Sequence, residues 1–293
     1  MLCRFEAFLA RNLFADVGHK TWCISQREAT SMMVNDEKYK SHHVFSELER
    51  YMDFYKSLSW SVLNFISIGT GAIYNIDSYV YSSIKGTLES IQKILNNGRI
   101  NDAYALLRKY YDSVIINIYS NLYLNDNFSI ENFVVKKIDN WLKGRDQLPD
   151  FRIMSNYIRS SDKVAPINSL LYADDRYKKI RDRCNDHTHY NFFLNVLLND
   201  NEIRLENRLQ VLNSFSVDAR DVFTLHLAYL FFLNNHYMTS SDYLDALECG
   251  MTPEPDSQYW VATFIQEVFD EIIKKQRPDI ASTIKRYTCM QLL

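Results

Sequence analysis

The sequence has few of the residues that interrupt helices, with only 7 glycines and 5 prolines among 293 residues. No segment shows the sustained alternation of apolar and polar residues that is typical of half-buried strands. Hydrophobic residues make up 47% of the chain and charged residues 24%, which are ordinary proportions for a globular protein. We therefore predict an all-α fold, a multi-helix bundle whose core is large enough to need neither disulfides nor metals.

Signals of export, membrane insertion and disulfide bonding are missing as well. The five cysteines are scattered and odd in number, so they cannot form a complete set of intrachain disulfides. The longest apolar stretches, residues 60–68 and 222–233, are shorter than the roughly 20 residues of a membrane-spanning helix. The N-terminus has neither the basic start nor the apolar run of a secretion signal. These features predict a cytoplasmic protein with no membrane partner.

Several catalytic signatures are also absent. The chain has no Gly-rich phosphate loop, no Cys/His zinc pattern, no HExxH and no GxSxG. P-loop nucleotide hydrolysis and zinc chemistry are therefore not expected, and we predict no cofactor and no metal. The net charge of −3 provides no global attraction to nucleic acid. Any contact with RNA must come from a local basic patch.

Apolar residues recur at three- and four-residue steps over most of the chain, which is the pattern of amphipathic helices. The first 35 residues show no clean period, and we interpret 1–35 as an N-terminal arm. We expect helices over residues 36–68, 73–95, 102–124, 129–144, 174–198, 217–237 and 259–272, a short last helix from Pro278, and an irregular connection between Pro149 and Pro166. The helix over 102–124 has the most regular apolar stripe, so we expect Asp102 to cap it and its residues to be the most buried. The breaks near Gly250 and Pro253 divide a main domain, 36–245, from a C-terminal helical extension, 246–293.

One dense polar cluster lies inside this helical pattern, over residues 181–191. It overlaps a basic run of five cations within eight positions, residues 176–183, of which Arg176, Lys178 and Lys179 are candidates for RNA binding. Cleavage of RNA without a metal needs a proton acceptor, a proton donor and a cation that holds the phosphate. Histidine titrates near neutrality, and arginine binds phosphate oxygens in a planar fork. The candidate catalytic residues are Arg181, Asp182, Arg183, Asn185, His187 and His189.

These residues resemble the motif of the HEPN superfamily, in which an Arg, often followed by a polar residue, precedes a His by four to six intervening residues. Arg181, followed by Asp182, has five residues between it and His187, and Arg183 has five residues between it and His189. A second similarity is Arg108 and Asp112, four apart in an apolar helix, which we treat as supporting residues. The resemblance covers residues 36–238 as an order of helices.

The resemblance implies a HEPN-like core and a metal-independent endoribonuclease that acts as a toxin or antiviral effector. It implies RNA as substrate, a homodimer, and a regulatory protein or antitoxin as partner. His187 or His189 would be the general base or acid, and Arg181 or Arg183 the phosphate clamp. In a continuous helix Arg183 shares a face with His187 and Arg181 shares one with Asn185. Because Arg181 and His187 then point apart, either the arginine reaches around the helix or a second subunit completes the site.

Other interpretations remain open at this point. The cluster could be a solvated helix face, or part of a non-catalytic module that binds RNA, nucleotide or a protein partner. Asp182, Asp186 and His189 share a face and could hold a divalent metal. Arg108 and Asp112 could be a structural ion pair in the core. A third match to the motif, Arg220-Asp221 before His226, lies in an apolar segment, where we expect a core histidine.

Overall fold

The computed structural model describes residues 31–64, 69–71 and 75–293. Most of these residues are helical, and within these ranges the only β-structure is three isolated bridges. The predicted all-α fold is confirmed. The predicted arm, 1–35, lies almost entirely outside the described residues. The helices are α3 (Glu37–Lys40), α4 (Val44–Ser61), α5 (Ile76–Asn96), α6 (Ile100–Asn127), α7 (Lys136–Leu142), α8 (Phe151–Arg159), α9 (Ala165–Leu171), α10 (Arg176–Thr188), α11 (Phe193–Leu197), α12 (Arg208–Leu233), α13 (Asp242–Glu248), α14 (Thr263–Val268) and α15 (Pro278–Tyr287).

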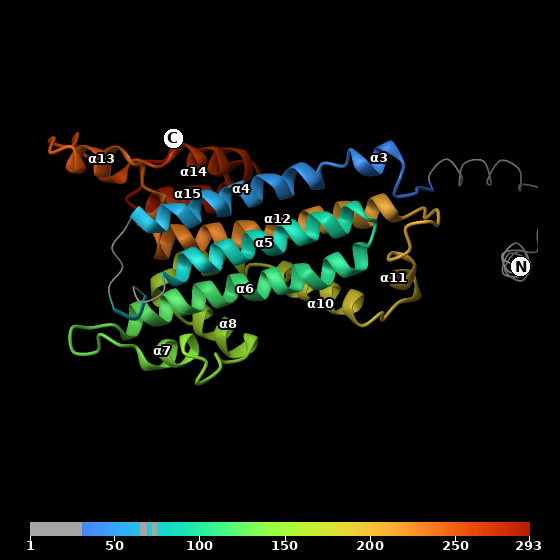
Figure 1. Ribbon diagram of the computed structural model, residues 1–293, viewed down its shortest axis with the longest axis horizontal. Helices are drawn as coiled ribbons and strands as arrows, with labels where there is room; N and C mark the ends of the chain where they lie inside the picture. Colours follow the sequence, from blue (N-terminus) through green and yellow to red (C-terminus); the bar gives the residue numbers. More distant parts are fainter. Residues whose placement is uncertain (1–30, 65–68, 72–74) are drawn as a thin grey trace, which may run out of the picture.

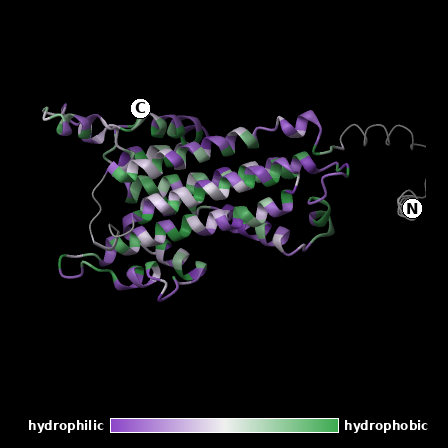
Figure 2. Cartoon of the chain, in the orientation of Figure 1, coloured by the Kyte–Doolittle hydropathy of each residue, from purple (hydrophilic) through white to green (hydrophobic). Residues whose placement is uncertain are grey.

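Four long helices, α4, α5, α6 and α12, run side by side and form an elongated bundle (Figure 1). Hydrogen bonds from α4 and its N-terminus to α12, His43 to Ser216 and Tyr55 to His226, show that α4 and α12 run parallel. Both α8 and α10 pack on the outside of α6, and α14 and α15 pack on α4 and α12 respectively. Hydrophobic and hydrophilic residues alternate along the bundle helices, as expected for helices with buried and exposed faces (Figure 2).

The most buried long helix is α12, not the predicted helix over 102–124. Of the 26 residues of α12, 16 are buried, whereas 14 of the 28 residues of α6 are buried. The prediction was wrong because burial depends on the number of neighbours. α12 packs against α4, α6, α9, α10 and α15, so it is covered on nearly every side. One hydrophobic cluster extends from Met32 to Met290, so residues beyond 246 share the same core as the bundle.

The turn between α5 and α6 confirms one predicted boundary and corrects another. Gly98 ends α5 with φ +76°, a left-handed conformation that glycine adopts at low cost. A Cβ there would lie 2.2 Å from Val34 Cγ2, so the position has no room for a side chain. Asp102 does not cap α6, which begins two residues earlier, at Ile100. Instead the Asp102 carboxylate accepts a hydrogen bond from Asn199 Nδ2 at 3.0 Å.

Other predicted boundaries also change. The connection predicted to be irregular contains α8, which begins where Asp150 accepts a hydrogen bond from the Ile153 amide at 2.9 Å. The helix predicted over 174–198 ends at Thr188, because Tyr190 adopts φ 50° and turns the chain before α11. The helix predicted over 36–68 is divided between Lys40 and Val44, and the one predicted from 129 begins at Lys136.

Candidate functional site

The predicted polar cluster lies on α10, which packs antiparallel to α6. Pairs such as His187 with Asn101 and Arg181 with Asp112 show this direction. The buried side of α10 repeats at three- and four-residue steps, through Tyr177, Ile180, Cys184 and His187. Each predicted polar residue is therefore placed by its position around the helix: His187 faces inward, Arg181 and Asn185 lie at the edge of the α6 contact, and Asp182 is exposed.

At this edge the predicted supporting residues, Arg108 and Asp112, contact the predicted catalytic residue Arg181, because Asp112 forms ion pairs with both arginines. Arg108 Nε lies 3.3 Å from one Asp112 oxygen, and Arg181 Nη1 lies 2.7 Å from the other. Arg108 also donates a hydrogen bond to the Asn185 side-chain oxygen. The predicted ion pair between Arg108 and Asp112 forms, but the side chains are 25% and 37% exposed, so it is half-buried and not in the core. It links α6 to α10 through Arg181 and Asn185.

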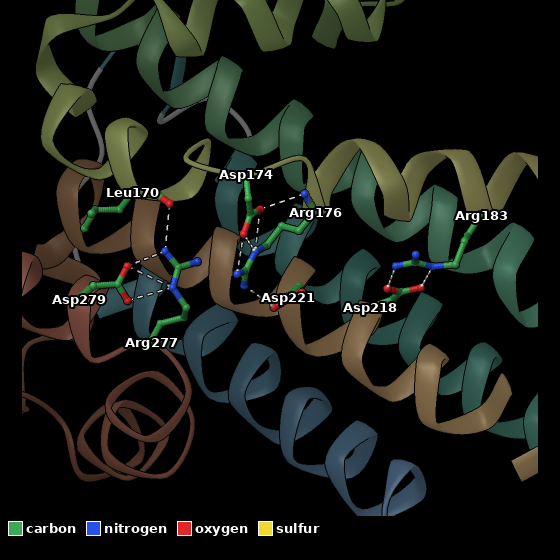
Figure 3. Close-up of polar contacts among 8 residues, drawn as sticks. All are labelled: Leu170, Asp174, Arg176, Arg183, Asp218, Asp221, Arg277 and Asp279. Carbon is green, nitrogen blue, oxygen red and sulfur yellow. Dashed lines mark hydrogen bonds and ion pairs between the residues drawn. The ribbon is translucent and has the colours of Figure 1, made fainter. Parts of the chain in front are cut away.

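The other arginines of the basic run form ion pairs that hold α10 in place. Arg183 binds the Asp218 carboxylate of α12 with two nitrogens, and Arg176 binds both Asp174 and Asp221 (Figure 3). Burial raises the pKa of Asp218, although hydrogen bonding to Arg183 lowers it. Arg176 and Arg183 therefore already form ion pairs within the fold. For either arginine to bind RNA or take part in catalysis, as predicted, its ion pairs would have to break.

His187 is a buried, neutral histidine. It is 7% exposed, its ring stacks on Tyr104 with centroids 4.0 Å apart, and its Nδ1 lies 2.8 Å from the Asn101 side-chain oxygen. Burial lowers the pKa of His187 to about 4; the Asp186 charge opposes this shift and the Arg183 charge adds to it. At neutral pH this imidazole can accept a proton but has none to donate as an acid.

His189 differs from His187 because it is exposed, immediately beyond the end of α10. The chain turns there: Asn191 donates its amide to the Asp186 carbonyl at 3.0 Å, and its side chain donates to the Asp186 carboxylate at 2.7 Å. Asp182 is exposed. Among the predicted catalytic residues, Arg181 and Asn185 thus lie at the edge of the α6 contact, Arg183 is paired with a buried carboxylate, and the ring of His187 is buried. They do not converge on one cleft within a single chain.

A pocket of about 520 Å³ lies next to this cluster, between α8 and α10, with Tyr111 of α6 also in its lining. Its cations are Arg152 and Arg159 from α8, and Lys178 and Arg181 from α10. The two from α8 were not predicted, because their segment was interpreted as an irregular connection. The signal was present in the sequence: Arg152, Ser155, Asn156 and Arg159 stand at helical spacing, so they share one face of the helix.

No metal site accompanies these residues. Within the described ranges, no three His, Cys, Asp or Glu side chains are grouped so that they could hold a metal ion, so Asp182, Asp186 and His189 do not form the alternative metal site. None of the helices that the structure describes has the length and apolar character needed to cross a bilayer. Comparisons with protein-family models, with curated proteins and with solved structures give no match. Only the geometry of this chain bears on its function.

Proposed function

We propose that this protein is a helical module that binds RNA through the face formed by α8 and α10. The observation that carries the proposal is a group of exposed cations without acidic partners. Arg152, Arg159, Lys178 and Lys179 are exposed, and among the described residues none of them forms an ion pair. Such cations can neutralise phosphates without first breaking an interaction in the fold.

The arrangement of the cations favours a polyanion. They extend from α8 across the pocket to α10, and the chain as a whole is mildly acidic, so the positive charge is local. Two acids line the pocket, Asp174 and Asp175, and Asp174 is already bound by Arg176 through both carboxylate oxygens. This face therefore presents excess positive charge to a ligand.

The test is a titration of labelled single-stranded RNA, followed by fluorescence anisotropy at several salt concentrations. A triple variant, Arg152→Gln, Arg159→Gln and Lys178→Gln, should weaken binding by more than about tenfold. The slope of log affinity against log salt should fall by about 0.7 for each phosphate that the variant no longer neutralises. Lys38→Gln with Lys40→Gln, two exposed lysines on α3, is the control and should change little. Equal affinity in the triple variant and the wild type would exclude this face.

Cleavage is the second candidate function, and one specific observation favours it. Arg183 and His187 lie one turn apart on α10, His187 is held neutral as a general base must be, and the exposed His189 follows at once. In this candidate the protein is a HEPN-like, metal-independent endoribonuclease, acting as a toxin or antiviral effector under a protein partner. A homodimer would supply from a second copy the groups that do not converge in one chain.

Cleavage is tested with RNA in the presence of EDTA, where the products should end in a 2′,3′-cyclic phosphate. His189→Ala should abolish turnover while the circular dichroism spectrum stays helical, because an exposed residue contributes little to stability. His226→Ala is the matched control: this histidine is fully buried in the core, as predicted, so it should cost stability first. Full activity of a variant lacking both His187 and His189 would eliminate the catalytic candidate.

A further inference from the structure

The pocket between α8 and α10 is built from two parallel sets of side chains. The face of α8 contributes Arg152, Ser155, Asn156 and Arg159, and the segment that leads into α10 and the helix itself contribute Asp174, Tyr177, Lys178 and Arg181. Both sets follow the spacing i, i+3, i+4, i+7, so each lines one side of the pocket. The pocket is therefore formed by one face of α8, one face of α10 and the connection before α10, which contributes Tyr172, Asp174 and Asp175.

Two of its arginines are fixed over aromatic rings. The Arg181 guanidinium carbon lies 3.4 Å from the centroid of the Phe151 ring, and the Arg159 guanidinium carbon lies 4.0 Å from that of Tyr172. Such cation–π contacts hold the guanidinium planes without using their N–H groups. They also cover one face of each ring, which makes stacking of a nucleobase on these faces unfavourable. The pocket therefore provides N–H donors and positive charge to a ligand.

The balance of charge favours a dianion. Arg181 is already paired with Asp112, so the cations of the pocket that have no acidic partner among the described residues are Arg152, Arg159 and Lys178, against the carboxylates of Asp174 and Asp175. The hydrogen bonds from Arg176 lower the pKa of Asp174 to about 2, so this carboxylate is ionised and already neutralised. A phosphodiester inside an RNA chain has one charge, whereas a terminal phosphate monoester has about 1.5 to 2 charges at pH 7 and three free oxygens.

We propose that this pocket binds the terminal phosphate monoester of an RNA strand. Arg152, Arg159 and Lys178 surround the phosphate, while Lys179, which lies outside the pocket and lines the neighbouring one, contacts the following backbone. The inference rests on the proposed RNA binding and deepens it, because it says which part of the strand the pocket selects.

The experiment compares the same single-stranded oligoribonucleotide with a 5′-phosphate, with a 3′-phosphate and with hydroxyls at both ends. For the wild type we expect one phosphorylated form to bind about tenfold more tightly than the hydroxyl form, as charge-assisted contacts to a dianion imply. In Arg152→Gln with Arg159→Gln this ratio should fall to about one. The matched control is Lys179→Gln, which should weaken all three strands alike and keep the ratio. Circular dichroism confirms that each variant is folded.

The possible failures are distinguishable. Equal binding of all three strands would overturn the inference and leave RNA binding intact. If no strand binds, the proposed function fails, and a titration with a nucleoside 5′-monophosphate then decides whether the pocket takes a monoester at all: binding that Arg159→Gln abolishes supports the pocket, and no binding overturns it. A phosphoserine peptide that competes as strongly as the phosphorylated RNA would overturn the assignment to RNA.

Discussion

Single residues in the core form a directed chain of hydrogen bonds that ends on an acid. Asn117 Nδ2 donates to Asp77 at 2.8 Å, so its oxygen must accept from His226 Nε2 at 2.9 Å. His226 Nδ1 therefore accepts from the Tyr55 hydroxyl at 2.7 Å, and Tyr55 in turn accepts from Tyr110 at 2.9 Å. The tautomer of His226 and the direction of every bond follow from the single contact between Asn117 and Asp77.

Asp77 should tolerate replacement by its amide but not by alanine. Its carboxylate has no cationic partner among the described residues, and it accepts from Asn117, Asn121 and the Tyr237 hydroxyl. In Asp77→Asn the oxygen can still accept from both amides, and the new NH₂ can donate to Tyr237, which then accepts. We expect this variant to be within about 1 kcal/mol of the wild type in urea denaturation.

Asp77→Ala is the contrasting variant. It removes the acceptor of the hydrogen bonds from Asn117, Asn121 and Tyr237, so we expect it to lose about 3 kcal/mol or more. If Asp77→Asn proved as unstable as Asp77→Ala, the negative charge itself would be required, and the hydrogen-bond explanation would be wrong.

The buried His226 should make stability depend on pH below neutrality. Burial lowers its pKa from 6.5 to about 3, so between these values the unfolded chain binds a proton that the folded chain does not. The contribution of His226 to the free energy of unfolding is therefore fully present above about pH 6.5. It falls as the pH is lowered, by on the order of 1 kcal/mol per pH unit. Urea denaturation from pH 7 to 4 should show a smaller pH dependence in His226→Gln than in the wild type. An unchanged slope would mean that His226 is not buried as a neutral ring.

At the scale of elements, two of the ion pairs that fix α10 differ in the burial of their carboxylate. One pair joins Arg183, which is 41% exposed, to Asp218 of α12, whose side chain is 1% exposed. The pair to α6 joins Arg181 to Asp112, and both of these side chains are partly exposed, at 24% and 37%. Exposed pairs contribute little, whereas removal of one partner from a buried carboxylate leaves an uncompensated charge.

Arg183→Ala should therefore cost about 3 kcal/mol of unfolding free energy, and Arg181→Ala about 1 kcal/mol or less. A double variant with Arg183→Ala and Asp218→Asn should recover part of the loss, because the buried charge is gone. Thermal or urea denaturation measures all three. Equal losses for the two single variants would show that burial of Asp218 does not govern the strength of its pair. A loss of activity in Arg183→Ala must accordingly be corrected for folding before it is interpreted as catalysis.

At the scale of the whole molecule, α12 should be the slowest segment to open. It is the most buried of the long helices and contacts helices from both ends of the chain. We expect its central amides, near residues 222–230, to exchange with solvent only on global unfolding. Hydrogen exchange followed by mass spectrometry compares them with amides at the middle of α6. Slower exchange in α6 would contradict this expectation and would agree with the prediction from the apolar stripe that α6 is the most protected helix.

Much of the fold is already determined by local sequence. The stop at Gly98, the stripe of α6 and the apolar character of α12 are properties of neighbouring residues, because helical periodicity and left-handed turns act over a few positions. The core role of His226 also follows from its apolar neighbours. α8 was missed because two prolines bound its segment and its apolar residues cover only one narrow face.

Only the tertiary structure decided which polar side chains are exposed and free to contact a ligand. The sequence places His187 and His189 in the same cluster, yet one stacks on Tyr104 and the other is exposed. It also contains no sign that Arg183 meets Asp218, 35 residues away, or that Arg152 and Lys178 line one pocket. The physical reason is that periodicity determines which residues share a face of α10, whereas the face that is covered depends on α6, α8 and α12, which come from distant parts of the chain.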